Sequence, residues 1–91
     1  MNRLRTLPGI VLVEIKDQYL LVADKEARKC CRYILPINET IAFYWHLLEQ
    51  GCTEEQLLEA AKEEFDAPSE LIASDLHQLL KMFIKLGYLI S

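Results

Sequence analysis

The sequence of 91 residues is poor in the residues that build disulfide frameworks and phosphate-binding loops. It contains three cysteines, three glycines and three prolines. An odd number of cysteines, with two of them adjacent, is a poor disulfide framework, so we expect reduced cysteines that behave as small apolar residues. With only three glycines, the chain has no glycine-rich loop of the kind that cradles phosphate groups.

Basic residues are also scarce. Ten lysines and arginines stand against fourteen acidic residues, which gives a formal charge of −4. Proteins that bind nucleic acid through phosphate contacts usually carry the opposite balance, so nucleic acid is an unlikely partner. No apolar run approaches the roughly 20 residues that span a bilayer, and no signal peptide follows the basic N-terminus. We therefore expect a cytoplasmic protein that does not contact a membrane.

Arrangements of residues typical of catalysis or metal binding are missing. No Ser/His/Asp or Cys/His set stands at a familiar spacing, and no nucleophilic cysteine has an evident activating base. The two histidines, His46 and His77, are far apart and have no metal-ligand spacing around them. We predict a protein that is not an enzyme and that carries no metal and no cofactor.

What the chain does have is a high apolar content. Hydrophobic residues make up 52% of the sequence, which argues against intrinsic disorder and suffices for a dense small core. We expect residues 1–91 to form a whole small protein with a single domain.

The first third of the chain has the pattern of β-strands. Two apolar runs, 10–15 and 18–23, are separated by a short polar break, and a third run at 28–35 ends before Pro36. Short connections between successive strands favour an antiparallel meander. In that order the first and third strands lie at the edges of the sheet.

From Asn38 onward the apolar spacing becomes helical. Asn38 is a good N-cap for a first helix, which ends before Gly51. Thr53 and Gln56 have the spacing of a capping box at the start of a second helix. A third helix carries an apolar stripe from Ile72 onward and ends at Gly87. The fold class is therefore α+β, with three strands and then three helices, which are the parts of a winged helix-turn-helix.

A series of short motifs resembles one known family over nearly the whole chain, from about Pro8 to Ile90. The motifs are Asn38-Glu39-Thr40, the run from Trp45 to Gly51, Thr53-Glu54-Glu55-Gln56-Leu57, Asp75-Leu76, and Leu86-Gly87-Tyr88-Leu89-Ile90. In this order and spacing they resemble the PqqD family, whose members are also called RiPP recognition elements.

The resemblance implies a non-catalytic peptide chaperone. Members of the family bind the leader of a ribosomally made precursor peptide and present it to a maturation enzyme, often a radical S-adenosylmethionine (radical SAM) protein. The product can be a redox cofactor of the pyrroloquinoline quinone type, a lasso peptide or another modified peptide. The leader is expected to add a strand to the third strand and to lie beside the third helix. Pro36 departs from the family pattern, and because proline cannot donate to a ladder, pairing should lie mainly upstream of it.

The residues themselves support the same site. An edge strand offers unpaired backbone groups to an extended peptide, and its basic residues suit an acidic leader. The third helix has more apolar residues than one stripe needs, so some should face a ligand, with Met82 on the groove wall. The predicted peptide-binding residues are Arg28, Lys29, Cys30, Cys31, Arg32, Tyr33, Ile34, Asp75, Leu79, Met82, Phe83 and Leu86.

Other interpretations of these features stay open at the level of sequence. Basic residues on an edge strand also serve to block aggregation. The third helix can be buried on two sides, or its apolar face can hold a second copy in a homodimer. Asp75 can be an ordinary solvated helix position. The alternative function is that of a DNA-binding winged helix, in which the third helix would contact the bases.

Overall fold

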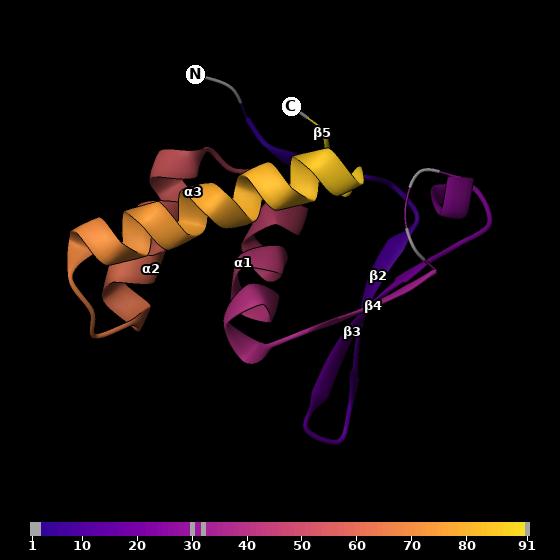
Figure 1. Ribbon diagram of the computed structural model, residues 1–91, viewed down its shortest axis with the longest axis horizontal. Coiled ribbons are helices and arrows are strands. Elements are labelled where there is room, and N and C mark those ends of the chain that lie inside the picture. The colour runs from indigo at the N-terminus through magenta and orange to yellow at the C-terminus, as the bar shows by residue number, and fades with distance from the viewer. Residues whose placement is uncertain (1–2, 30, 32, 91) are drawn as a thin grey trace.

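The computed structural model describes residues 3–29, 31 and 33–90, and it confirms an α+β fold (Figure 1). A three-stranded antiparallel sheet precedes three helices, as the sequence predicts. The elements are β1 (Arg5–Thr6), β2 (Ile10–Ile15), β3 (Gln18–Ala23), the 3₁₀ helix η1 (Ala27–Lys29), β4 (Ile34–Ile37), α1 (Glu39–Glu49), α2 (Glu54–Glu64), α3 (Ser69–Leu86) and β5 (Leu89–Ile90).

The main sheet has the strand order β2-β3-β4, so β2 and β4 are its two edges, as predicted. The register pairs Leu12 with Leu21 and Leu21 with Leu35 across the three strands. Paired residues point to the same face, so these three leucines turn together toward the core. Their burial fixes the register, because a slip by one residue would expose all of them.

The prediction of a third strand over 28–35 is wrong in its bounds. Arg28 and Lys29 lie in η1, and the strand begins only at Ile34. The Asp24 side chain accepts a hydrogen bond from the backbone N–H of Ala27 at 2.9 Å. Such an aspartate-initiated turn competes with extended backbone and starts the 3₁₀ helix instead.

Pro36 lies inside β4 and does not end it. The backbone N–H of Ala23 donates to the carbonyl of Tyr33 at 2.9 Å, which makes these residues a hydrogen-bonded pair. Such pairs alternate along an antiparallel ladder, so the pair of Leu20 and Pro36 is a non-hydrogen-bonded one. The ring nitrogen of Pro36 therefore faces away from β3, and the ladder loses no bond.

Local capping signals define the first two helices as predicted. The Asn38 side chain accepts from the N–H of Ile41 at 2.8 Å and starts α1. Thr53 and Gln56 form the capping box of α2, with reciprocal hydrogen bonds of 3.2 and 2.9 Å. At the end of α3, Gly87 adopts a left-handed conformation with φ 89° and turns the chain toward β5.

A second, two-stranded sheet joins the beginning and the end of the described chain. β1 pairs with β5, with Thr6 opposite Leu89, and in Figure 1 the indigo segment near the start of the chain passes beside β5. The backbone N–H of Leu7 also donates to the carbonyl of Tyr88 at 2.9 Å. This second sheet was not predicted, because strands of two residues have no periodicity that the sequence can reveal.

An aromatic cluster fixes α3 against α1. The rings of Trp45, Phe83 and Tyr88 are fully buried, with centroids 5.6 Å apart for Trp45 and Phe83 and 5.8 Å apart for Phe83 and Tyr88. Aromatic pairs in this geometry add to the free energy gained by burying the rings. The cluster therefore determines which face of α3 is internal and which is left for other contacts.

Neither membrane-spanning helices nor clustered metal ligands are found among the described residues. No described helix is both long enough and apolar enough to cross a bilayer. No group of three or more histidine, cysteine, aspartate or glutamate side chains in that part of the chain is placed to hold a metal ion.

Two glycines with positive φ provide a matched test of the turn before β2. A Cβ atom at Gly9 (φ +92°) would lie 2.5 Å from both carboxylate oxygens of Asp24, whereas one at Gly51 (φ +80°) would meet no atom within 4 Å. Gly51→Ala should lower the free energy of unfolding by about 1 kcal/mol through backbone strain alone. Gly9→Ala should lower it by roughly 2 kcal/mol or more, because Asp24 must also move. Urea unfolding measures both, and equal losses would show that the contact with Asp24 is unimportant.

Candidate functional site

The outer edge of β4 presents backbone groups that no described strand uses. Hydrogen-bonded and non-hydrogen-bonded pairs alternate along the β3–β4 ladder, starting from the hydrogen-bonded pair of Ala23 and Tyr33. The N–H and C=O of Leu35 therefore point toward β3. The same alternation directs both backbone groups of Ile34 and the carbonyl of Pro36 outward. Because proline has no N–H, Ile34 is the position within β4 that offers an outward donor and an outward acceptor together. Its side chain is 45% exposed.

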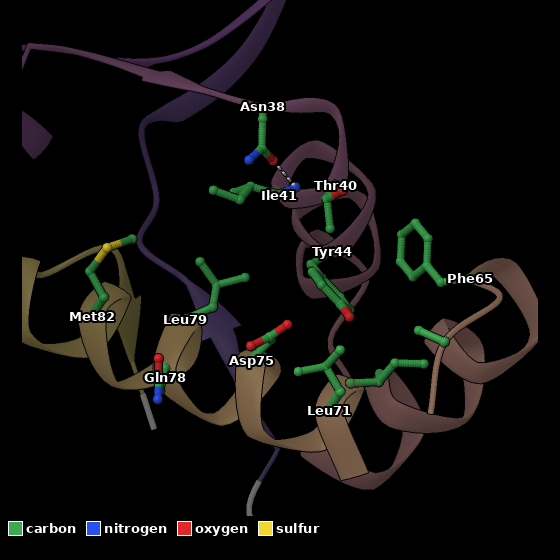
Figure 2. A pocket seen from close by; sticks show the side chains of 12 residues that line it. Asn38, Thr40, Ile41, Tyr44, Phe65, Leu71, Asp75, Gln78, Leu79 and Met82 are labelled. Atoms are coloured by element: carbon green, nitrogen blue, oxygen red, sulfur yellow. Dashed lines mark hydrogen bonds between the residues drawn. The ribbon is translucent and has the colours of Figure 1, made fainter. Parts of the chain in front are cut away.

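An apolar cavity of about 520 Å³ opens where β4 passes into α1 (Figure 2). Its size is typical of pockets that hold small ligands or side chains. The residues that line it come from the start of α1, the segment after α2, and one face of α3: Asn38, Thr40, Ile41, Tyr44, Phe65, Ala67, Leu71, Ile72, Asp75, Gln78, Leu79 and Met82.

The residues that α3 contributes to this cavity follow a helical spacing. Leu71, Asp75, Gln78 and Met82 follow one another at intervals of three and four residues, so they share one face of the helix. That face is separate from the buried face that carries Phe83. Leu71 is 53% exposed and Met82 is 39% exposed, which is unusual for large apolar side chains on a helix that also has a full core face.

The polar groups of the cavity are concentrated around Asp75 and Tyr44. Figure 2 shows Asp75 on α3 and Tyr44 on α1, both directed into the space between the two helices. Burial, and to a smaller extent the Asp75 carboxylate, raises the pKa of Tyr44 above its ordinary value of 10.0. The Tyr44 hydroxyl therefore stays protonated at neutral pH and is available as a hydrogen-bond donor at the wall of the cavity.

Of the α3 residues predicted for the site, Asp75, Leu79 and Met82 do line the cavity. Phe83, which was predicted as a peptide-binding residue, does not line the cavity, because its side chain is fully buried against Trp45. Leu86 is half-buried and packs against the core instead of lining the cavity.

Arg28 and Lys29, the two described members of the predicted basic cluster, do not lie on the strand edge. The Arg28 guanidinium donates to the carbonyl of Ala23 at 3.1 Å and lies 3.6 Å from the centre of the Tyr33 ring. Lys29 forms an exposed ion pair of 3.2 Å with Glu26. Both cations thus have intramolecular partners within η1 and its flanks.

The remaining predicted residues are the two cysteines, Arg32, Tyr33 and Ile34. Cys31 is buried, and its Sγ lies 3.2 Å from the carbonyl of Gly87. Tyr33 is 52% exposed and precedes β4, of which Ile34 is the first residue. Cys30 and Arg32 lie outside the described residues.

Several cavity residues were not predicted, chiefly Asn38, Tyr44, Phe65 and Gln78. Gln78 shares the α3 face of Asp75, so the helical spacing was an available signal. The others are the N-cap of α1, a residue within α1 and the C-cap of α2, and only the packing of these helices brings them to the cavity.

A second, acidic cavity of about 390 Å³ lies next to the first and shares Thr40 and Phe65 with it. Its polar residues include Glu14, Glu39 and Glu64. The nearby carboxylates, Glu14 foremost, raise the pKa of Tyr19. The surface beside the apolar cavity is thus negatively charged.

A three-stranded antiparallel sheet whose edge strand β4 leads to an apolar cavity between two helices is the arrangement of a small α+β domain. The family model for coenzyme PQQ synthesis protein D (PqqD) matches residues 32–89 of this chain. The chain belongs to the PqqD family, as the sequence resemblance indicated. None of the curated proteins matches it in sequence.

Two solved structures have the same fold. One is TbiB1 in complex with the TbiA(beta) leader peptide, with a TM-score of 0.76, 19% sequence identity and 93% of each chain covered. The other is a lasso peptide synthetase B1 complexed with its leader peptide, with a TM-score of 0.76 and 15% identity, covering 97% of this chain and 98% of that one.

The contribution of Asp75 to the cavity can be measured through Tyr44. Asp75→Asn should lower the pKa of Tyr44 without bringing it to 10.0, because burial is the larger cause of the shift. A raised pKa in the folded state gives stability that is present below about pH 10 and is lost as the pH rises through the folded value. Asp75→Asn should therefore reduce the decrease in the free energy of unfolding that occurs at alkaline pH.

Titration of the Tyr44 ring carbon by NMR provides the measurement. Glu63→Gln removes one charge on α2 outside both cavities and serves as the control. An unchanged Tyr44 pKa in Asp75→Asn would show that the carboxylate does not act on the hydroxyl.

Proposed function

We propose that this protein binds the leader region of a ribosomally made precursor peptide by adding it as a strand to β4. The observation that carries the proposal is the outward donor and acceptor pair of Ile34 next to an apolar cavity. Main-chain pairing at a sheet edge supplies affinity for an extended peptide, and a neighbouring pocket supplies specificity for its side chains.

The comparisons support this assignment. The chain belongs to the PqqD family, and both solved structures with the same fold are described as leader-peptide complexes. The shared fold places a sheet edge and a third helix in the same order along the chain. Peptide binding is therefore the activity that best joins the family, the fold and the cavity.

At residue level, the peptide would pair with Ile34 and continue past the start of α1 to the cavity. Leu79 and Met82 would contact its side chains, and Asp75 would accept hydrogen bonds from it. Tyr33, which precedes the edge strand, would flank the peptide. The cations of η1, Arg28 and Lys29, would meet an acidic segment of the leader only by exchanging their present partners.

The wider role follows from the same proposal. We infer a non-catalytic chaperone that works in the cytoplasm, where precursor peptides are synthesised, and that presents the leader to a maturation enzyme of the radical SAM type. The modified peptide can be of the pyrroloquinoline quinone, lasso or a related type. A homodimer through the apolar face of α3 would compete with the peptide for the same cavity.

DNA binding, the alternative function, is not favoured. Two α3 residues that a recognition helix would offer to bases, Asp75 and Gln78, line an apolar cavity instead, and one of them is an anion. α2 carries two acidic residues in its first turn, which would face phosphate groups unfavourably.

Hydrogen exchange at Ile34 tests strand addition directly. The probe is a synthetic leader segment of the cognate precursor peptide. Without peptide, the outward N–H of Ile34 should exchange quickly, whereas that of Leu35 is held by β3. Saturating peptide should slow exchange at Ile34 by at least tenfold and change Leu35 little. Unchanged exchange at Ile34 in a saturated complex would exclude pairing along β4.

A pair of proline substitutions separates the two edges of the sheet. Ile34→Pro removes the outward donor of β4. Glu14 pairs with Tyr19 of β3 in a non-hydrogen-bonded pair, so its N–H also points outward, and Glu14→Pro removes the equivalent donor of β2. Ile34→Pro should weaken peptide binding about 3- to 10-fold, the value of one net hydrogen bond. Glu14→Pro should leave the affinity within twofold in titration calorimetry. Equal losses in the two variants would contradict the choice of edge.

Charged substitutions on two faces of α3 test the cavity. Met82→Asp places a charge on the cavity wall and should weaken peptide binding at least tenfold. Ile84→Asp, at a residue that is 47% exposed and does not line the cavity, should have little effect. Circular dichroism checks that both variants fold. Full affinity in a folded Met82→Asp variant would move the binding site away from this cavity.

A further inference from the structure

The charges around the apolar cavity have one sign. Among the described residues that line it, Asp75 is the sole charged side chain. No lysine or arginine in the described part of the chain forms an ion pair with it. The adjacent cavity adds Glu39 and Glu64 across the shared Thr40 and Phe65. A ligand that enters here therefore meets negative charge, and no lysine or arginine is among the described residues that line either cavity.

The walls of the cavity suit a long aliphatic stem. Ile41, Leu71, Leu79 and Met82 form apolar surfaces on both sides, and Asp75 lies between Leu71 and Leu79 along α3 (Figure 2). Lysine and arginine side chains bury their methylene groups along such surfaces while the charged head stays near polar groups. The Tyr44 side chain, which is 4% exposed, closes one wall of the cavity.

We propose that this cavity selects a lysine or arginine side chain of the bound peptide, with its methylene stem between α1 and α3 and its cationic head at Asp75. The inference rests on the proposed function, because it names the chemistry of one position in the leader. A carboxylate in the same place would stand against Asp75 and Glu39. The cavity thus selects a cationic residue of the peptide, whereas the basic residues of η1 would favour an acidic one.

Two pairs of small probes test this selectivity without any precursor peptide. N-acetyl-arginine methylamide is compared with the citrulline compound, which has nearly the same shape and no charge. N-acetyl-lysine methylamide is compared with the norleucine compound. Titrations followed by the backbone amide signals of Leu71, Asp75 and Leu79 give the dissociation constants. We expect each cation to bind about three- to fivefold more tightly than its neutral partner, as for a partly exposed ion pair.

Matched variants assign the preference to one carboxylate. Asp75→Asn should abolish the difference within each pair of probes, while the neutral compounds keep their affinity. Glu63→Gln, which removes a charge outside both cavities, should preserve the difference. Dispersed amide spectra confirm that both variants fold.

Three results would overturn the inference. These are equal affinities within both pairs of probes, a cation preference that survives Asp75→Asn, and no shift of the cavity signals by any probe up to its solubility limit. Single capped residues cannot form a strand, so these results are independent of hydrogen exchange at Ile34. A negative result in the probe titrations would not contradict strand addition, and a negative result in hydrogen exchange would not contradict the preference of the cavity for a cation.

Discussion

An unpaired sheet edge is the constraint on which the site depends. A three-stranded meander has two edges, and the chain leaves β4 directly for α1 without adding a fourth strand. The backbone groups of Ile34 therefore lack a partner strand, which is a liability unless a ligand or water satisfies them. Pro36 limits that liability, because it removes one donor from the same edge. The edge can therefore pair with one peptide through Ile34, but it offers too few donors for extended pairing between copies of the chain.

The core of the protein determines where the cavity can be. Trp45, Phe83 and Tyr88 bind one face of α3 to α1 and to the segment before β5. With that face used, the stripe that contains Asp75 and Met82 is turned toward the start of α1. The cavity is the space left between two helices that are joined firmly on one side only. One face of α3 thus packs in the core, and another face of the same helix lines the cavity.

Most of the fold is predictable because its signals are local. Asn38, Thr53 and Gly87 mark helix ends through contacts with backbone within a few residues, and each has the expected role. The error at 28–35 arose from another local contact, the Asp24 side chain with the N–H of Ala27, which the alternation of apolar residues does not reveal. The placement of Phe83 failed for a different reason. Two apolar stripes lie on α3, and only contacts with α1 decide which of them is internal.

The pairing of β1 with β5 has a consequence for how the chain reaches its final state. Residues 5–6 and 89–90 must meet, so this contact closes nearly the whole chain into a loop and has a high entropic cost. During synthesis, β1 leaves the ribosome before the helices and cannot pair until residues 89–90 have also emerged. The main sheet and the helices can form earlier, but the native arrangement is completed only after β5 has been synthesised.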